Sequence, residues 1–391
     1  MSTLSPQEAA VLADAVYGIR EVSKEAKSND IVRGVKERLG GSFDQLNRNW
    51  DIAAASVAHG QSGLTSSKES GFAMVVPGIN ERRGQSAVLF RGTQTKSDWG
   101  TNFTLGGSNG PSGLLVHTGF NRVFNTLKGN LQSTLSKRLN GQIHVVGHSL
   151  GGALGNLMAA QLACGLDKKP KLYTFGAPRV GFNNFASVLE QRVGSKNIYR
   201  VYDIADPVPM IPIFPFVHSP RSINGIKVGV GGGAVNVPSH FMGNYMPRVN
   251  GLEWGALANN EAAGVNLRDI DGLLNIASQH VKIPGASMGL WALGKVLQAL
   301  IDISFLVVSP ATTIAFTAMD KLAQLLTHVA VVSKKIGSRI MQFMEMVFKW
   351  LGRSVAKPAI ELTSAFLRYV LGLLITPIIM LARSAIDRFS S

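Results

Sequence analysis

A serine in a short turn between a strand and a helix is the strongest chemical signal in this chain. Ser149 lies in Gly147-His-Ser-Leu-Gly151, after the β-branched run 143–146 and before residues 153–163, whose types favour a helix. A serine in a strained strand-to-helix turn needs neighbours without side chains, because the two backbones must approach while the hydroxyl stays exposed. We therefore predict that Ser149 is a nucleophile; the alternative is a structural serine that caps the helix.

The same five-residue pattern occurs a second time, at Gly106-Gly-Ser-Asn-Gly110. No long β-run precedes this copy, and Pro111 follows it, so the strand and the helix that give the pattern its meaning are missing. We expect Ser108 to lie in a loop.

A serine nucleophile needs a histidine to take its proton and a carboxylate to orient that histidine. With this kind of turn the chain order is serine, acid, histidine. Two aspartates follow the strand-like run 197–202, namely Asp203 and Asp206. His218, His240 and His280, all downstream of the two aspartates, are the candidates for the base.

Two donors to a developing oxyanion follow from the same mechanism. Residues 72–76 and 86–90 read as a hairpin, and the second strand runs into a Gly-Thr turn at Thr93. The residue after the nucleophile, Leu150, supplies one N–H, and Thr93 supplies the other. An ordinary turn is the alternative interpretation of the Gly-Thr pair.

Seven motifs in the span from about residue 72 to residue 245 resemble, in the same order, those of the class 3 lipases, the fungal-lipase-like branch of the α/β-hydrolases. They are Phe90-Arg-Gly-Thr93, Asp98-Trp99, Val116-His-Thr-Gly-Phe120, the serine turn itself, Tyr173-Thr-Phe-Gly-Ala-Pro-Arg-Val-Gly181, Arg200-Val-Tyr-Asp-Ile-Ala-Asp-Pro-Val-Pro209 and Ser239-His-Phe-Met-Gly-Asn-Tyr245.

The resemblance implies an α/β fold, with a hydrolase sheet and flanking helices, and it selects among the open candidates. Asp206, directly before two prolines that would stiffen its loop, matches the acid of the family, and His240 matches its catalytic histidine. Asp203 is left with hydrogen bonding at the strand end, and His218 matches a histidine that is not catalytic.

The resemblance also implies a lid over residues 100–115. Five glycines in this segment favour a mobile or open flap over a stiff amphipathic helix. Four other histidines are predicted to be structural: His59, His117, His144 and His148.

Composition indicates a packed globular body with an anionic partner. The chain has 391 residues, 46% hydrophobic residues and a formal charge of +15, with lysine and arginine spread along its length. We expect an anionic membrane surface as partner, and no nucleic acid, because no recognition motif with interleaved aromatics is present. Clustered metal-ligand patterns are also missing, so neither a metal nor a cofactor is expected.

The sequence also bears on compartment. Cys164 is the only cysteine, so no intrachain disulfide can form. The first residues have neither a basic nor an apolar signal region. We expect a protein that is cytoplasmic in its producer or exported by a signal-independent route, and that is membrane-associated when it acts.

Three regions are predicted. Residues 1–70 form an N-terminal helical segment that packs on the hydrolase, with a helix from Pro6 to about Arg20 that Ser5 and Glu8 cap. Residues 71–284 form the hydrolase domain, in which 225–237 is a loop or hairpin. Residues 285–391 form an amphipathic and hydrophobic helical region.

This last region contains 11 lysines and arginines and 5 acidic residues, which gives it a net charge of +6. Residues 319–351 read as one amphipathic helix. Two uncharged, more apolar stretches are residues 303–319, which contain Pro310, and residues 369–382, which contain Pro377. Each is shorter than the roughly 20 apolar residues of a spanning helix. We favour helices that lie on an anionic surface; a bundle packed on the hydrolase and a spanning hairpin are the alternatives.

The sequence thus predicts a serine ester hydrolase that acts on lipids, with phospholipid as the first expected substrate. An acyltransferase with the same triad, or a membrane-perturbing protein with an inert hydrolase scaffold, are the alternatives. The organisation also resembles bacterial lipase effectors of type VI secretion, which implies an immunity or secretion partner protein.

Overall fold

The computed structural model describes residues 3–61, 69–92, 106–136, 141–213, 215–221, 225–229, 233–258, 270–282, 286–307, 318–353 and 362–388. The chain divides into two compact units. The first comprises Met1–Val228, Val237–Glu261 and Ala382–Ser391, and the second comprises Gly229–Asn236 and Ala262–Leu381.

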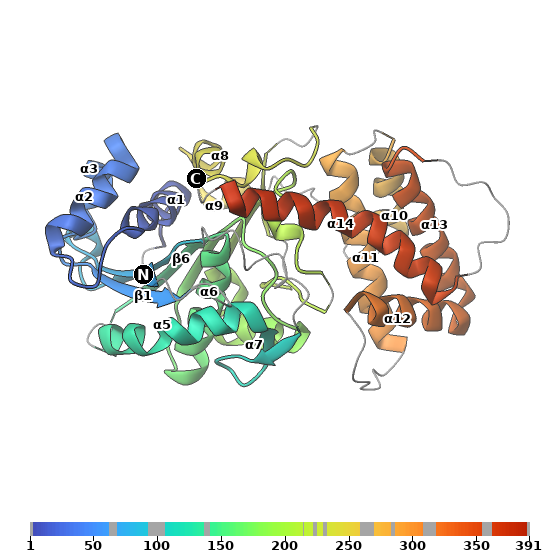
Figure 1. Ribbon diagram of the computed structural model, residues 1–391, viewed down its shortest axis with the longest axis horizontal. Helices are drawn as coiled ribbons and strands as arrows, with labels where there is room; N and C mark the ends of the chain where they lie inside the picture. The colour runs from blue at the N-terminus through green and yellow to red at the C-terminus, as the bar shows by residue number, and fades with distance from the viewer. Residues whose placement is uncertain are drawn as a thin grey trace. The chain divides into compact units, whose positions relative to one another are not determined.

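A seven-stranded sheet forms the centre of the first unit (Figure 1). Its strands, in their order across the sheet, are β1 (Ser56–Gln61), β2 (Glu69–Pro77), β3 (Ser86–Phe90), β6 (Ile143–His148), β7 (Lys171–Phe175), β8 (Ile198–Asp203) and β9 (Ile226–Val228). The first three strands pair antiparallel, as the predicted hairpin requires, and β3 to β9 pair parallel. Every residue of β3, β6 and β7 is buried, as expected for parallel strands that helices cover on both faces.

Helices cover both faces of this sheet. On one face lie α5 (Thr118–Ser136), α6 (Leu150–Ala160) and α7 (Asn183–Val193); on the other lie α1 (Pro6–Ala15), α8 (Met242–Val249) and α9 (Trp254–Ala258) (Figure 1). The N-terminal region adds α2 (Ser28–Leu39) and α3 (Phe43–Asn47). This is the α/β-hydrolase sheet with flanking helices that the sequence predicts. A separate two-stranded hairpin consists of β4 (Gly107–Asn109) and β5 (Leu115–His117).

The N-terminal segment begins as predicted and then departs from the prediction. The Glu8 N–H donates to Ser5 Oγ at 3.1 Å, which caps α1. The helix ends at Ala15, five residues before the expected end, and a 3₁₀ turn, Val16–Ile19, follows it. Glu8 does not close a capping box; its carboxylate accepts instead from Trp50 Nε1 at 2.8 Å and from Arg82 Nε at 2.9 Å.

Two glycines allow the 3₁₀ turn to lie directly against α2. A Cβ added at Gly34 would come within 2.2 Å of the Gly18 carbonyl oxygen, so the two backbones can touch only because neither residue has a side chain. Apolar side chains of this N-terminal segment join the same buried cluster as Val146 of β6 and Tyr245 of α8. The segment is thereby fixed to the sheet.

The second unit contains a helical bundle. Its helices are α10 (Ile270–His280), α11 (Ser287–Val307), α12 (Ala318–Val332), α13 (Lys334–Trp350) and most of α14 (Ser364–Arg388). The predicted single helix over residues 319–351 is two helices, because Ser333 leaves helical geometry and its Oγ accepts the Ile336 N–H to cap α13.

The apolar face predicted on residues 319–351 is buried inside this unit. Seven of the eight residues predicted for this face are buried: Leu322, Leu326, Val329, Ile336, Ile340, Phe343 and Val347. The eighth, Leu351, is only partly buried. Helix α13 packs on α10, α11 and α12. The expectation that this apolar face of α12 and α13 lies against a membrane is therefore wrong for the residues described.

Helix α14 runs through Pro377, where the sequence indicated an interruption. In the described part of the chain, Ser364–Ile386 is the one helix long and apolar enough to cross a membrane, with a mean hydropathy of 2.0. Length and composition alone are weak evidence, because core helices of soluble proteins pass the same test. The predicted loop 225–237 also differs from expectation, since it begins with strand β9.

Candidate active site

The turn between β6 and α6 holds Ser149 in a strained backbone conformation, with φ 58° and ψ −131°. Residues with a side chain rarely adopt positive φ, and such strain concentrates at functional sites. The turn is supported by its neighbours: the Ser149 N–H donates to the Phe175 carbonyl of β7 at 3.0 Å. This is the geometry expected of a nucleophile between a strand and a helix.

The two glycines of the motif are required by close backbone contacts. A Cβ at Gly147 would lie 2.2 Å from the Gly151 carbonyl oxygen, and a Cβ at Gly151 would lie 2.0 Å from the Phe90 carbonyl oxygen. Both distances are far below any real carbon–oxygen contact. The turn can therefore approach the end of β3 only with glycine at both positions, as the sequence predicts.

His240 lies between Ser149 and Asp206. Its Nε2 is 2.8 Å from Ser149 Oγ, and its Nδ1 is 2.8 Å from Asp206 Oδ2. Asp206 and His240 are completely buried, and Ser149 is 4% exposed. The structure thus brings together the three side chains that the sequence nominates, from segments up to 91 residues apart.

Asp206 receives two further hydrogen bonds. The Val208 N–H donates to its Oδ1 at 2.8 Å, and the Tyr245 hydroxyl donates to its Oδ2 at 2.7 Å. A buried carboxylate is costly unless donors replace its water, and these contacts supply them. Burial, and then the Asp206 charge, raise the pKa of Tyr245 well above its usual value, so the phenol keeps its proton. Tyr245 stands in the last of the seven motifs, but its residue type alone does not predict this contact.

Asp203 makes the strand-end contacts expected of it. Its Oδ1 accepts the Ala205 N–H at 2.9 Å, its carboxylate pairs with Arg248, and its N–H donates to the Tyr245 hydroxyl at 3.0 Å. Asp203 is therefore linked to the triad only through Tyr245, whose hydroxyl also donates to Asp206.

The other histidines make structural contacts. His218 Nε2 is 2.8 Å from the Pro209 carbonyl oxygen, and His59 Nε2 is 2.8 Å from that of Val22. His144 Nε2 is 2.8 Å from Gln85 Oε1, and burial lowers the pKa of His144 to about 3. His117 is completely buried among aromatic rings, and His280 ends α10 of the second unit.

One of the two predicted oxyanion donors can be described. Leu150 is the first residue of α6, so its N–H belongs to the four that a helix leaves without intrahelical acceptors, at the positive end of the helix dipole. Thr93 lies outside the described residues. The preceding residue, Gly92, reaches the site, because a Cβ added there would lie 3.2 Å from Ser149 Cβ.

A buried arginine fixes this turn. Arg91 donates from Nη1 to the Gly92 carbonyl at 2.8 Å and from Nη2 to Ser70 Oγ at 2.6 Å. Its guanidinium also lies 4.3 Å from the centre of the Phe72 ring. Burial lowers the pKa of Arg91 to about 10, so it stays charged at neutral pH. Sequence reasoning missed this role, although the residue stands in the quoted Phe-Arg-Gly-Thr motif.

The predicted lid is only partly covered, because residues 100–105 lie outside the described part of the chain. Residues 106–115 contain β4 and the turn toward β5. Ser108, the serine of the second glycine motif, lies in β4, where its Oγ accepts from Asn121 Nδ2 at 2.9 Å. Over the described residues, no group of His, Cys, Asp and Glu side chains is arranged to hold a metal ion.

Comparison with known proteins identifies the core of the first unit. Residues 87–216 match the family model of the class 3 lipases. A secreted mono- and diacylglycerol lipase of Fusarium solani is 32% identical over 144 residues, which are 35% of this chain. The matched segment spans less than half of that relative, 43% of its length.

Solved fungal lipases are also similar to this chain. The lipase of Rhizopus microsporus var. chinensis is 20% identical, with a TM-score of 0.40 over 57% of this chain and 72% of its own. The LIP2 lipase of Yarrowia lipolytica is 21% identical, with a TM-score of 0.43 over 57% of this chain and 79% of its own.

The glycine contacts generate a test of the turn. Gly151→Ala should remove at least 99% of esterase activity and lower the melting temperature, because the added Cβ would push the Phe90 carbonyl away from the β6–α6 turn. Gly155→Ala is the matched control in the same helix. Its Cβ would make ordinary contacts at 3.4 Å or more, and we expect full activity with stability raised by about 0.4–1 kcal/mol. Equal activity losses in the two variants would refute the steric argument.

The two aspartates generate a second test. Asp206→Asn should lower kcat by about 10⁴-fold, because it removes the carboxylate that fixes the His240 tautomer and stabilises its cation. Asp203→Asn should lower kcat by less than tenfold, since Asp203 does not contact His240. Steady-state kinetics on a soluble short-chain ester separate the two, and a larger loss for Asp203→Asn would contradict the assignment.

Proposed function

We propose that the chain is a serine ester hydrolase that acts on lipids, with Ser149 as nucleophile, His240 as general base and Asp206 as the acid that orients it. The observation that carries the proposal is His240, which is 2.8 Å from both the serine oxygen and the aspartate oxygen. The positive φ of Ser149 supports the same assignment, because it sets the hydroxyl at the tip of the turn.

The geometry suggests the following sequence of steps. Ser149 Oγ attacks the acyl carbonyl while His240 Nε2 takes its proton, and Asp206 stabilises the resulting imidazolium. The Leu150 N–H, and the Thr93 donor expected from the sequence, would hold the oxyanion. His240 then returns the proton to the leaving alcohol, and water releases the acid from the acyl-enzyme by the same route in reverse.

The substrate we propose is a phospholipid. The formal charge of +15 favours an anionic lipid surface over uncharged droplets. Neutral glyceride is the second candidate, because the Fusarium relative is named a mono- and diacylglycerol lipase. Acyl transfer to another acceptor would use the same three residues, and an inert scaffold in a membrane-perturbing protein would use none of them. Delivery as a bacterial effector, with an immunity or secretion partner, remains a prediction from the sequence.

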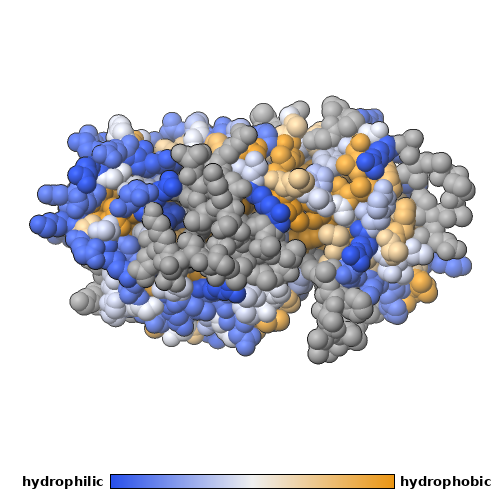
Figure 2. Space-filling model, in the orientation of Figure 1, coloured by the Kyte–Doolittle hydropathy of each residue, from blue (hydrophilic) through white to orange (hydrophobic). Residues whose placement is uncertain are grey.

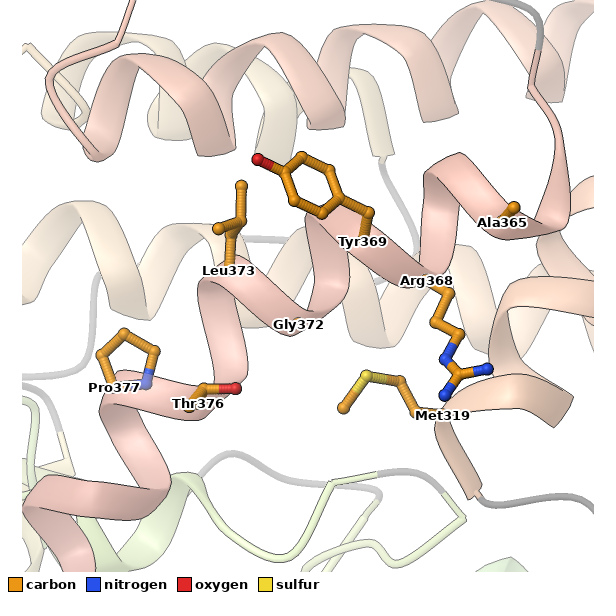
Figure 3. A pocket seen from close by; sticks show the side chains of 8 residues that line it. All are labelled: Met319, Ala365, Arg368, Tyr369, Gly372, Leu373, Thr376 and Pro377. Carbon is orange, nitrogen blue, oxygen red and sulfur yellow. The ribbon is translucent and has the colours of Figure 1, made fainter.

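We further propose that α14 provides membrane contact. Tyr369 and Met380 on this helix are 53% and 64% exposed, so both present apolar surface to the surroundings. Between α14 and the start of α12 lies an open groove of about 670 Å³ with a mostly apolar lining that includes Met319, Tyr369 and Leu373 (Figure 3). Arg368 lies at the groove and pairs with Asp320 at 2.8 Å. Apolar and polar residues are interspersed over the visible face of the second unit (Figure 2).

The function is tested with purified protein and vesicles of defined phospholipid or triglyceride. We expect release of fatty acid and lysolipid from phospholipid, and loss of at least 99.9% of this release in Ser149→Ala with an unchanged circular dichroism spectrum. Ser108→Ala is the matched control, and it should retain full activity. Activity on triglyceride alone would replace the phospholipid proposal, whereas equal activity of Ser149→Ala and Ser108→Ala would refute the mechanism.

Membrane contact is tested by flotation with anionic vesicles. Tyr369→Ser with Met380→Ser should weaken vesicle binding by about a hundredfold or more, because two apolar side chains of roughly 1.5–3 kcal/mol each no longer enter the lipid. Kinetics on a soluble short-chain ester should not change. Val331→Ser with Val332→Ser, on the exposed end of α12, is the control and should bind normally. Binding should also weaken with salt; identical binding of both double variants would contradict the role of α14.

A further inference from the structure

A tyrosine of the N-terminal segment reaches the candidate active site. Tyr17 lies in the 3₁₀ turn after α1, and its side chain is buried. Its hydroxyl oxygen accepts the Gly92 N–H at 3.1 Å, and it lies 2.7 Å from His148 Nδ1. The hydroxyl therefore joins the turn at the end of β3 to the residue next to the nucleophile, although 131 residues separate Tyr17 from His148.

The second nitrogen of His148 leads to the general base. His148 Nε2 is 2.7 Å from the His240 carbonyl oxygen, and the rings of the two histidines lie 4.7 Å apart at 33°. A carbonyl oxygen can only accept, so His148 carries its proton on Nε2 and donates it to His240. Its Nδ1 must then accept from the Tyr17 hydroxyl. The direction of every bond is thereby fixed: Gly92 N–H to Tyr17, Tyr17 O–H to His148, and His148 N–H to His240.

This arrangement requires a neutral His148. The imidazole is completely buried, and burial, followed by the charge of His240, holds the pKa of His148 well below its usual value. A second cation 4.7 Å from His240 would oppose the imidazolium that forms during acyl transfer. His148 can therefore act only as a fixed hydrogen-bonding link, which agrees with the expectation that it is structural.

We propose that Tyr17 is a positioning residue, which acts through His148 to hold His240 and through Gly92 to hold the turn beside the nucleophile. The inference rests on the proposed function, because it supposes that His240 is the general base. The bond to the His240 carbonyl limits rotation of the base about its backbone, and the bond from Gly92 fixes the loop that faces Ser149. Displacements near 1 Å in such groups are enough to cost about a hundredfold in rate.

The neighbours of Tyr17 keep its ring in place. The Arg38 guanidinium lies 5.3 Å from the centre of the ring and donates from Nη2 to Asp14 Oδ1 at 2.5 Å. Gly92 also has to be glycine here, since a Cβ would lie 2.7 Å from the Tyr17 hydroxyl oxygen. The hydroxyl is thus held by packing from one side and by two hydrogen bonds from the other.

The chain offers a closely matched control in Tyr173. Its hydroxyl accepts the Leu4 N–H at 3.1 Å and lies 3.4 Å from Nδ1 of the buried His144. It therefore makes the same two kinds of contact as Tyr17 and also ties the N-terminal segment to the sheet, but it does not touch the triad. Tyr173→Phe measures what the loss of such a hydroxyl costs in stability alone.

The experiment compares Tyr17→Phe, Tyr173→Phe and the unaltered protein on a soluble short-chain ester, with melting temperatures measured in parallel. We expect kcat to fall by about 10- to 100-fold in Tyr17→Phe, with KM changed by less than threefold, because the ring and its packing remain while the positioning of His240 is lost. Tyr173→Phe should show a similar change in melting temperature with kcat within twofold of the unaltered protein. Equal kcat values for the two variants would overturn the proposal.

A second variant keeps the test decisive if Tyr17→Phe folds poorly. His148→Phe retains an aromatic ring and breaks the link at its centre. By itself, His148→Phe should lower kcat by about 10- to 100-fold with KM changed by less than threefold, because the link from Tyr17 to His240 is broken. A kcat of His148→Phe within twofold of the unaltered protein would overturn the proposal. An unaltered protein that hydrolyses no ester would instead refute the proposed function, so the two failures are distinguishable.

Discussion

The close backbone approach at the end of β6 is the constraint on which the rest of the site depends. Gly147 and Gly151 let the β6–α6 turn touch itself and the Phe90 carbonyl at the end of β3. That contact forces Ser149 to positive φ and brings the first N–H groups of α6 to the carboxyl edge of the parallel strands. The loops after β3, β7 and β8 open at the same edge, so the partners of the serine can reach it from distant parts of the chain.

A second constraint is the buried carboxylate. Asp206 has no exposed surface, and an ionised group without water needs several donors to offset its desolvation. His240, Tyr245 and the Val208 N–H together provide them. Because Tyr245 also accepts the Asp203 N–H, the strand end, the acid and helix α8 form one hydrogen-bonded unit. The base is thus oriented by an acid that is itself held on three sides.

The sequence predicted the features that depend on local chemistry. The serine turn, the β2–β3 hairpin and the Ser5 cap rest on short motifs or strand-length patterns, whereas Asp206 and His240 were selected through the family resemblance. The roles of Tyr17, Tyr245 and Arg91 could not be predicted, because each depends on contacts that only the folded chain creates, such as the 131-residue separation of Tyr17 and His148. The sequence pattern around a tyrosine is the same whether its hydroxyl contacts water or an imidazole in the folded chain.

The helical region shows another limit of pattern analysis. Periodicity correctly identified which positions of α12 and α13 are buried, but a dry face does not specify whether protein or lipid covers it. The break at Ser333 was missed because a serine whose side chain caps the next helix leaves the apolar spacing nearly intact. Conversely, Pro377 lies within α14, since a proline perturbs a helix without always ending it.

The N-terminal segment is best understood as part of the site. Its apolar residues share a buried cluster with Tyr245, and Leu4 is anchored twice, by its N–H to Tyr173 and by its carbonyl to Trp254 at 2.6 Å. Tyr17 is the one hydroxyl of this segment that reaches both Gly92 and His148 among the contacts described. Loosening α1 would therefore change the loop beside the nucleophile and the support of the base together, so stability of the first twenty residues and turnover should be coupled.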